Sequence, residues 1–286
     1  MKKIKISAGY DTSENLTERL IKQFKTPDID LSEIEFVFDE SYDIIIFFNY
    51  VNENIVEGAK SFLFPHEPSW NGSHQKSFSD GTTVFGFSQE LYSGDFIESV
   101  AHTFYGGRGP WVDTLDFWNY ETLIESKFIK SKTISSSITR LNSNFGQPCI
   151  YPQRYEILQK IKKNNSIDIF DGDISPKRKD ALVDYKFNIS IENSYEKNWI
   201  TEKFYDNILT NTIPIYFGCK NIKDIYPEDG YILIDDINDI DGVDKLLKEI
   251  INNSDEIYNQ KIKGLEEIKI KYFKEKNILN KIKNLL

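Results

Sequence analysis

The sequence has 286 residues, 40% of them hydrophobic and 14% aromatic, and a formal net charge of −10. This composition can fill sizeable cores and excludes an intrinsically disordered chain, and the length favours two domains. The acidic balance argues against a nucleic-acid-binding protein, which needs a basic face to neutralise phosphates, but it permits a local basic pocket for one nucleotide.

The cysteines and the first residues favour a reducing compartment. Cys149 and Cys219 fit neither a disulfide framework nor a zinc-binding spacing. The basic start, MKKIKIS, has no apolar run of signal-peptide length. No segment reaches the roughly 18–20 apolar residues that a membrane span requires. We therefore expect a cytoplasmic protein.

Short apolar runs dominate the first half of the chain. The predicted strands there are residues 2–6, 35–38, 43–48, 61–64 and 83–88. A helix is predicted over 13–24, with Ser13 as its cap and leucines at helical spacing. Strands that alternate with helices indicate a parallel sheet.

A stretch rich in Gly, Pro and Trp, 104–123, precedes a second α/β pattern, and we place the domain boundary at residue 128. The second half is predicted to contain strands at 132–138, 167–170, 186–191, 213–217 and 230–237, and helices at 153–163 and 199–210. Two successive α/β halves predict two Rossmann-like domains, 1–128 and 129–260, facing each other across a central cleft. Ligands in such sheets bind beyond the carboxyl ends of the strands.

Polar residues gather where the strand predicted at 186–191 ends. Glu192, Asn193 and Ser194 follow that strand, and Thr201, Glu202 and Lys203 fall in the first turn of the next helix. A helix N-terminus suits a phosphate but disfavours a lysine, so Lys203 is placed for an anion rather than for helix stability. The residues alone leave a plainer alternative open, in which Glu202 interacts with the helix dipole and Lys203 is solvated.

The stretch FNISIENSYEKNWITEKFYDNILTNTIPIYFG resembles the signature of the family 10 glycosyltransferases, the α-1,3/1,4-fucosyltransferases. That signature is a strand ending in Glu-Asn-Ser, a loop, Tyr-Val-Thr-Glu-Lys, a helix, and a strand of the type Val-Pro-Val-aromatic-aromatic-Gly. The matches run in order to Pro214 and Gly218. The resemblance implies a GT-B fold, a GDP-fucose donor and inversion at the anomeric carbon.

The resemblance also implies roles for the residues of this donor motif, which includes Glu192 and Thr201. Lys203 is expected to contact the donor diphosphate, and Glu202 to lie near the donor sugar. Asn193 and Trp199 are expected to line the nucleotide site. Trp199 stands where the family has tyrosine, so a hydrogen bond from a phenol is not available.

A second phosphate ligand is expected upstream, where YPQRYEILQKIKKNNSIDIFDG resembles the family's Arg-helix-strand segment. We expect Arg154 to be this ligand, with Arg140 as the alternative, because a guanidinium grips phosphate oxygens in a planar fork. For either arginine, a surface salt bridge is the structural alternative.

An inverting transfer needs a base for the acceptor hydroxyl, usually a carboxylate. In SFLFPHEPSWNGSH an apolar strand leads to Glu67, which is the expected base, with His66 as the second candidate. Both residues could instead only shape the turn. Acceptor binding is assigned to His66 and Trp70, and an aromatic platform could add Phe78, Tyr105 and Trp111.

The acidic runs 171–173 and 235–241 lack the spacing of a calcium loop, and we expect no metal or other cofactor. The basic amphipathic tail, 261–286, either contacts anionic membrane as a peripheral anchor or packs back on the domains.

The predicted function is transfer of L-fucose from GDP-fucose to a glycan or lipid-linked oligosaccharide. Another GDP-sugar donor, or a non-catalytic glycan- or nucleotide-binding module, is the alternative.

Overall fold

The structure is a computed structural model of the chain. It describes residues 1–69, 71, 81–87, 95–101, 104, 117–138, 143–163, 166–170 and 177–286. Five residues named above as candidates therefore lie outside the described residues: Trp70, Phe78, Tyr105, Trp111 and Arg140. The acidic run 171–173 lies outside them as well.

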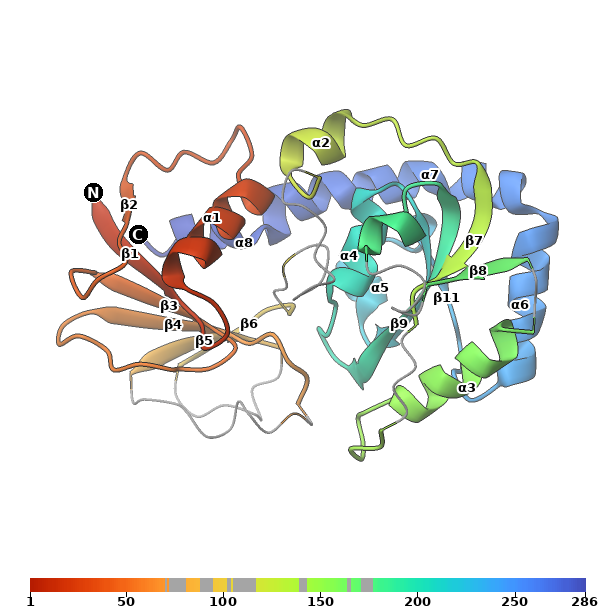
Figure 1. The fold of residues 1–286 in the computed structure, drawn as a ribbon, viewed down its shortest axis with the longest axis horizontal. Helices are drawn as coiled ribbons and strands as arrows, with labels where there is room; N and C mark the ends of the chain where they lie inside the picture. The colour runs from red at the N-terminus through yellow and green to blue at the C-terminus, as the bar shows by residue number, and fades with distance from the viewer. Residues whose placement is uncertain are drawn as a thin grey trace.

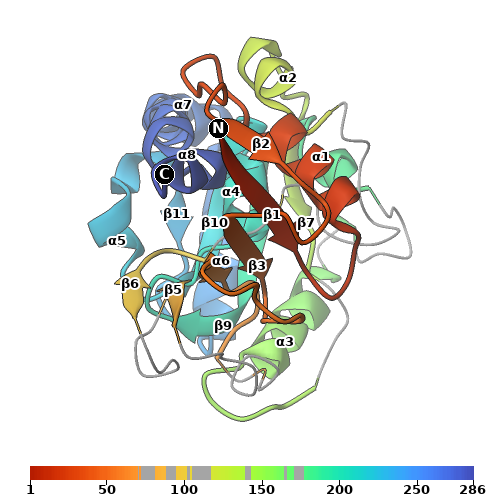
Figure 2. The same ribbon diagram turned by 90° about the vertical axis from the view of Figure 1, so that its left-hand side faces the viewer.

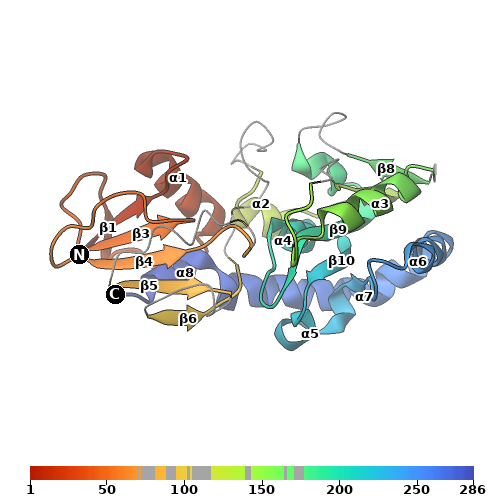
Figure 3. The same cartoon turned by 90° about the horizontal axis from the view of Figure 1, so that it is seen from below.

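The first half of the chain folds into a parallel six-stranded sheet with the order β2-β1-β3-β4-β5-β6 (Figure 1). Its strands are β1 (Lys2–Ser7), β2 (Ile34–Phe36), β3 (Ile44–Phe48), β4 (Lys60–Phe64), β5 (Thr82–Gly86) and β6 (Phe96–Glu98). Helix α1 (Ser13–Phe24) connects β1 to β2 and buries Leu16, Leu20 and Phe24. In Figure 3 the arrows of β3 to β6 point toward the second half of the molecule.

The second half forms a parallel five-stranded sheet with the order β11-β10-β9-β7-β8. Its strands are β7 (Lys132–Ser136), β8 (Ile167–Ile169), β9 (Tyr185–Glu196), β10 (Ile213–Cys219) and β11 (Ile232–Leu233). The remaining α-helices are α2 (Tyr120–Glu125), α3 (Tyr151–Ile161), α4 (Glu202–Leu209), α5 (Ile222–Ile225), α6 (Ile240–Asn252), α7 (Ser254–Lys271) and α8 (Ile278–Lys283). Short 3₁₀ turns occupy Arg178–Ala181 and Glu228–Gly230, and a π-helical turn occupies Tyr272–Lys276.

Two parallel sheets connected by helices confirm the predicted α/β class with two Rossmann-like halves. The sheets lie on either side of residue 128, since β6 ends at Glu98 and β7 begins at Lys132. The cap of α1 was predicted one residue late, because the Thr12 side chain accepts from the Asn15 N–H. The short elements β6 and α2 were not predicted, and the strand expected at 230–237 contains only the two residues of β11.

Strand β9 runs further than its apolar pattern predicts. Regular pairing with β10 ends at Ile191–Phe217 and resumes at Glu196–Cys219. The chain therefore advances five residues along β9 while it advances only two along β10. The extra residues form a bulge, a device that redirects side chains near functional sites. Glu192, Asn193 and Ser194 lie in this bulge, within the strand rather than after it as predicted.

The C-terminal helices return to the first domain. Helix α7 runs along the second domain, and the chain then crosses to α8, which lies beside α1 (Figures 1 and 2). Ile278, Leu279 and Ile282 of α8 are buried, so this part of the predicted basic tail packs back on the protein. Apolar residues of both halves belong to one buried cluster. Among the described residues, no helix has both the length and the apolar character that a membrane crossing requires.

Asn277 anchors this return of the chain. It is fully buried, its Nδ2 donates to the Phe24 carbonyl at the end of α1 (2.6 Å), and its Oδ1 accepts from the Leu279 N–H at 2.9 Å. The first bond joins the C-terminal helix to the first domain, and the second caps α8.

Asn277→Ala should lower the free energy of unfolding by about 1–3 kcal/mol, because it removes the hydrogen bond to the Phe24 carbonyl and the side-chain cap of α8. Urea unfolding of the full chain measures this change. Asn253→Ala is the matched control, since the exposed Asn253 donates only to the Glu249 carbonyl. Equal losses in the two variants would contradict the anchoring role of Asn277.

Candidate active site

Glu192 is the buried centre of the candidate site. Its carboxylate accepts from the Thr201 backbone N–H at 2.8 Å and from the Thr201 hydroxyl at 2.6 Å. The Tyr216 hydroxyl donates to the same carboxylate at 3.3 Å. Gly218 provides the space, because a Cβ at that position would lie 2.3 Å from Glu192 Cγ. The carboxylate therefore joins the bulge of β9 to the start of α4.

Helix α4 begins with a threonine cap and a lysine. Thr201 is the N-cap, and its hydroxyl oxygen accepts from the Lys203 N–H at 3.3 Å. Lys203 Nζ lies 2.9 Å from Glu202 Oε1 and 3.5 Å from Glu192 Oε2. The two carboxylates thus hold an ammonium group at a helix end whose dipole repels it.

Burial and the neighbouring charges together shift the pKa values of Glu192 and Lys203. Burial raises the pKa of Glu192, Glu202 raises it further, and Lys203 and the Thr201 hydrogen bonds partly oppose the rise. For Lys203, burial lowers the pKa, but attraction to Glu202 and Glu192 outweighs burial, and the net shift is upward. Lys203 is therefore a permanent cation at neutral pH.

Arg154 is a second cation near Glu192, Glu202 and Lys203, and it has no counter-ion of its own among the described residues. It lies on α3 and is 2% exposed, and its guanidinium carbon lies 5.2 Å from the centre of the Tyr151 ring. Its Nε has no hydrogen-bond partner, and Arg154 forms no ion pair within the described part of the chain. Burial lowers the pKa of Arg154, and the charges of Tyr151, Glu192 and Glu202 oppose that shift. A buried, unpaired guanidinium is costly unless an anionic ligand reaches it.

Arg178 is a site residue that the sequence did not reveal. Its Nε lies 3.3 Å from the fully buried Asp206 Oδ2, and its Nη2 donates to the Lys203 carbonyl at 3.4 Å. A third nitrogen donates to the Ser137 hydroxyl just after β7. Arg178 thus fastens the first turn of α4 to the end of the neighbouring strand. In the sequence it stands in the charged run PKRKD, which has the pattern of a solvated turn.

Asn193 and Trp199 bond to each other. The indole N–H of Trp199 donates to Asn193 Oδ1 at 3.1 Å. Trp199 is 1% exposed, and its ring meets Phe87 of the first domain edge-on, with ring centres 4.9 Å apart. Ala101 completes this small buried cluster. Trp199 therefore joins the two domains, and its expected contact with a nucleotide remains a prediction.

The candidate base, Glu67, lies in the first domain, in the loop after β4. Glu67 is partly buried, and His66 is buried against Phe48 and Phe104, with ring centres 4.9 and 5.8 Å away. Two residues further on, the Ser69 N–H donates to Glu196 Oε1 at the end of β9, at 3.2 Å. The loop that carries Glu67 is thus bonded to the second domain. The role of Glu67 as base remains a prediction.

The family model described as glycosyltransferase family 10 (fucosyltransferase), C-terminal part, matches residues 129–282, which is more than half of the chain. The chain belongs to glycosyltransferase family 10. The match covers β7 to α8 and so contains the Glu192, Arg154, Arg178 and Lys203 group. The resemblance predicted from the sequence is confirmed.

Individual relatives agree with the family assignment. A fucosyltransferase-like protein of Arabidopsis thaliana is 29% identical over 141 residues, which span 47% of this chain and 27% of that protein. The α-(1,3)-fucosyltransferase B of Drosophila melanogaster is 35% identical over 105 residues, 36% of this chain and 22% of that protein. The chain thus matches only about a quarter of the length of these curated relatives.

A solved structure of an α1,3-fucosyltransferase with GDP-fucose has the same fold. It superposes with a TM-score of 0.53 at 14% identity, over 91% of this chain and 81% of that one. This agreement supports the GT-B arrangement that the two sheets of the family 10 chain already show.

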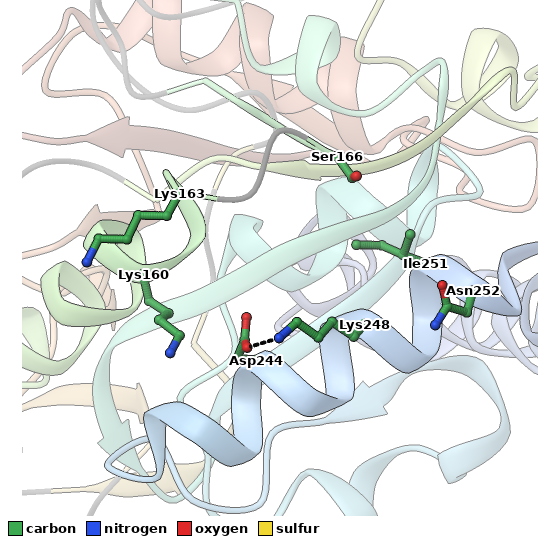
Figure 4. A pocket seen from close by; sticks show the side chains of 7 residues that line it. All are labelled: Lys160, Lys163, Ser166, Asp244, Lys248, Ile251 and Asn252. Carbon is green, nitrogen blue, oxygen red and sulfur yellow. Dashed lines mark hydrogen bonds and ion pairs between the residues drawn. The ribbon is translucent and has the colours of Figure 1, made fainter.

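The family 10 chain also has a separate cavity of about 500 Å³ between α3 and α6 (Figure 4). Its lining comprises Lys160, Lys163, Ser166, Asp244, Lys248, Ile251 and Asn252. None of the predicted site residues lines it, and two of its lysines already pair with aspartates, Lys160 with Asp241 and Lys248 with Asp244. In the described residues no group of three or more His, Cys, Asp or Glu side chains could hold a metal ion.

Arg154→Met and Arg178→Met should change stability in different ways. Arg154→Met removes a buried charge that has no ion-pair partner among the described residues, so the free energy of unfolding should stay the same or rise. Arg178→Met removes the cation that lies 3.3 Å from the buried Asp206 carboxylate and should cost about 3–5 kcal/mol. Urea unfolding of both variants without ligand measures the contrast. A large loss for Arg154→Met would show that this guanidinium has a structural partner.

Proposed function

We propose that the chain transfers L-fucose from GDP-fucose to a hydroxyl group of a glycan or lipid-linked oligosaccharide, with inversion at the anomeric carbon. Membership of family 10 supports a sugar transfer, and the similar structure was determined with GDP-fucose. The observation that carries the proposal is the buried Arg154, which has no ion-pair partner among the described residues and whose charge acts on Lys203 at the N-terminus of α4.

The charges at this site suit a diphosphate. Arg178 is neutralised by Asp206, and Lys203 by Glu202 and Glu192, whereas Arg154 is left over in the described part of the site. A diphosphate would accept hydrogen bonds from the guanidinium of Arg154 and from the ammonium of Lys203. A guanidinium and a helix N-terminus both favour phosphate oxygens. The donor-binding roles of Asn193, Trp199 and Thr201 belong to the same proposal.

The reaction then needs three groups. A carboxylate at Glu67 takes the proton of the acceptor hydroxyl as its oxygen forms the new bond to the anomeric carbon. The bond from that carbon to the diphosphate oxygen breaks, and Arg154 and Lys203 stabilise the negative charge on the departing GDP. Glu202, next to Lys203, would lie at the donor sugar and stabilise positive charge on the ring. No step of this reaction requires a metal ion.

Location and acceptor are part of the proposal. A cytoplasmic enzyme acting on a lipid-linked acceptor would work beside a membrane. The apolar face of α8 is already buried, so a peripheral contact would rest on the lysines of the tail rather than on inserted apolar residues. Another GDP-sugar remains the alternative donor, since the described site concerns the diphosphate more than the sugar.

A donor screen tests the proposed function. Purified protein is incubated with GDP-fucose, GDP-mannose or UDP-sugars and a mixed glycan panel, and the product mass identifies the sugar transferred. We expect a fucose increment from GDP-fucose alone. Transfer only from a UDP-sugar, or nucleotide binding without any transfer, would contradict the proposal.

Arg154→Met and Lys203→Ala should each weaken GDP binding roughly 10- to 100-fold, because each removes a charge-assisted hydrogen bond to the diphosphate. Isothermal titration with GDP measures this. Lys248→Ala, in the separate cavity of Figure 4, should leave the affinity unchanged. GDP affinity that survives both site substitutions would remove the diphosphate role.

Glu67→Gln should lower kcat by roughly 10²- to 10⁴-fold without changing the affinity for GDP, because only proton transfer is lost. Initial rates at saturating donor, together with GDP titration, measure the two effects. His66→Asn is the companion variant, since His66 is the second candidate base. Full activity in Glu67→Gln with loss in His66→Asn would reassign the base.

A further inference from the structure

The segment between β9 and α4 carries several contacts between the two domains. Asn198 Nδ2 donates to Glu98 Oε1 on β6 at 2.8 Å, and the Ala101 N–H donates to the Asn198 carbonyl at 3.1 Å. Trp199 packs on Phe87 from the same segment. These contacts lie at the ends of β5 and β6, and none of them is made to the loop that carries Glu67.

Glu196 makes a different contact, directly to that loop. It is buried, and its Oε1 accepts from the Ser69 N–H at 3.2 Å and from the Ser194 hydroxyl. Pro65 and Pro68 flank Glu67 in the described first part of this loop and restrict the backbone there. Ser69 is two residues from Glu67, so their Cα atoms lie within about 7 Å of each other.

Glu67 is therefore fixed on both sides. On one side His66 is packed between Phe48 and Phe104, and on the other the backbone of Ser69 is bonded to Glu196. Glu196 follows Glu192 by four residues and lies at the end of the same bulge of β9. One strand thus contacts both the donor side, through Glu192, and the loop of the candidate base, through Glu196.

We propose that Glu196 is a positioning residue for the transfer reaction, whose carboxylate holds the loop carrying Glu67 against the donor domain. This inference rests on the proposed function and on Glu67 as the base. A base acts only within hydrogen-bond reach of the acceptor hydroxyl, and a displacement of about 1 Å can cost roughly 100-fold in rate. Loss of the Glu196 contact should therefore lower kcat and leave the diphosphate site intact.

The test compares kcat for fucose transfer and GDP affinity in four variants of the full chain. Glu196→Ala should lower kcat roughly 10- to 100-fold and change GDP affinity by less than about twofold. Glu196→Gln should retain most of the activity, because its amide oxygen still accepts from the Ser69 N–H. Ser69→Pro, which removes that N–H and leaves Glu196 unchanged, should reproduce the loss. Glu98→Ala is the matched control, since Glu98 is another carboxylate between the domains but bonds to Asn198 and Lys197.

A double-mutant cycle separates positioning from general loosening of the domains. In a Glu67→Gln background, Glu196→Ala should reduce the remaining rate by less than about threefold, because the positioned group is already absent. A full additional loss there, an equal loss in Glu98→Ala, or an unchanged kcat in Glu196→Ala and Ser69→Pro would overturn the inference. A wild-type protein without transferase activity would overturn the proposed function and this inference with it. If Glu67→Gln alone keeps full activity, Glu67 is not the base. The positioning role of Glu196 then fails, whereas the proposed fucose transfer stands.

Discussion

The buried carboxylate of Glu192 is the interaction on which the site depends. It accepts from the backbone and the hydroxyl of Thr201, and it thereby fixes where helix α4 begins relative to the sheet. A charge with no access to water is tolerated only when hydrogen bonds and a counter-ion surround it. Thr201, Tyr216 and Lys203 provide that surrounding, and Gly218 provides the space.

From this constraint follows the arrangement of the other charges. Lys203 cannot leave the N-terminus of α4 without leaving Glu192 unpaired, and Arg178 holds the same turn from the side of β7. Arg154 is buried next to them with no paired carboxylate in the described residues. The protein therefore holds two cations, Lys203 and Arg154, at and near a helix N-terminus, and Arg154 has no carboxylate partner in the described residues, which suits an anionic ligand.

The sequence predicted the two sheets, most strands and the donor motif, because these are local patterns. Alternation of apolar residues located β9, but it stopped at Ile191, and the polar bulge that follows has no periodic signal. Arg178 and Glu196 were missed because their partners are distant in sequence: Glu196 bonds to Ser69 across 127 positions. Trp199 was recognised as unusual, but its packing on Phe87 depends on how the domains meet, which a single sequence does not show.

The direct test is the affinity of the wild-type protein for GDP, GMP and guanosine, measured by isothermal titration under one set of salt conditions. If Arg154 and Lys203 hold a diphosphate, affinity should fall at least roughly 10-fold from GDP to GMP and further to guanosine. Equal affinities for the three ligands would show that the buried cations do not bind the phosphates, and would contradict the assignment of this cluster as the donor site.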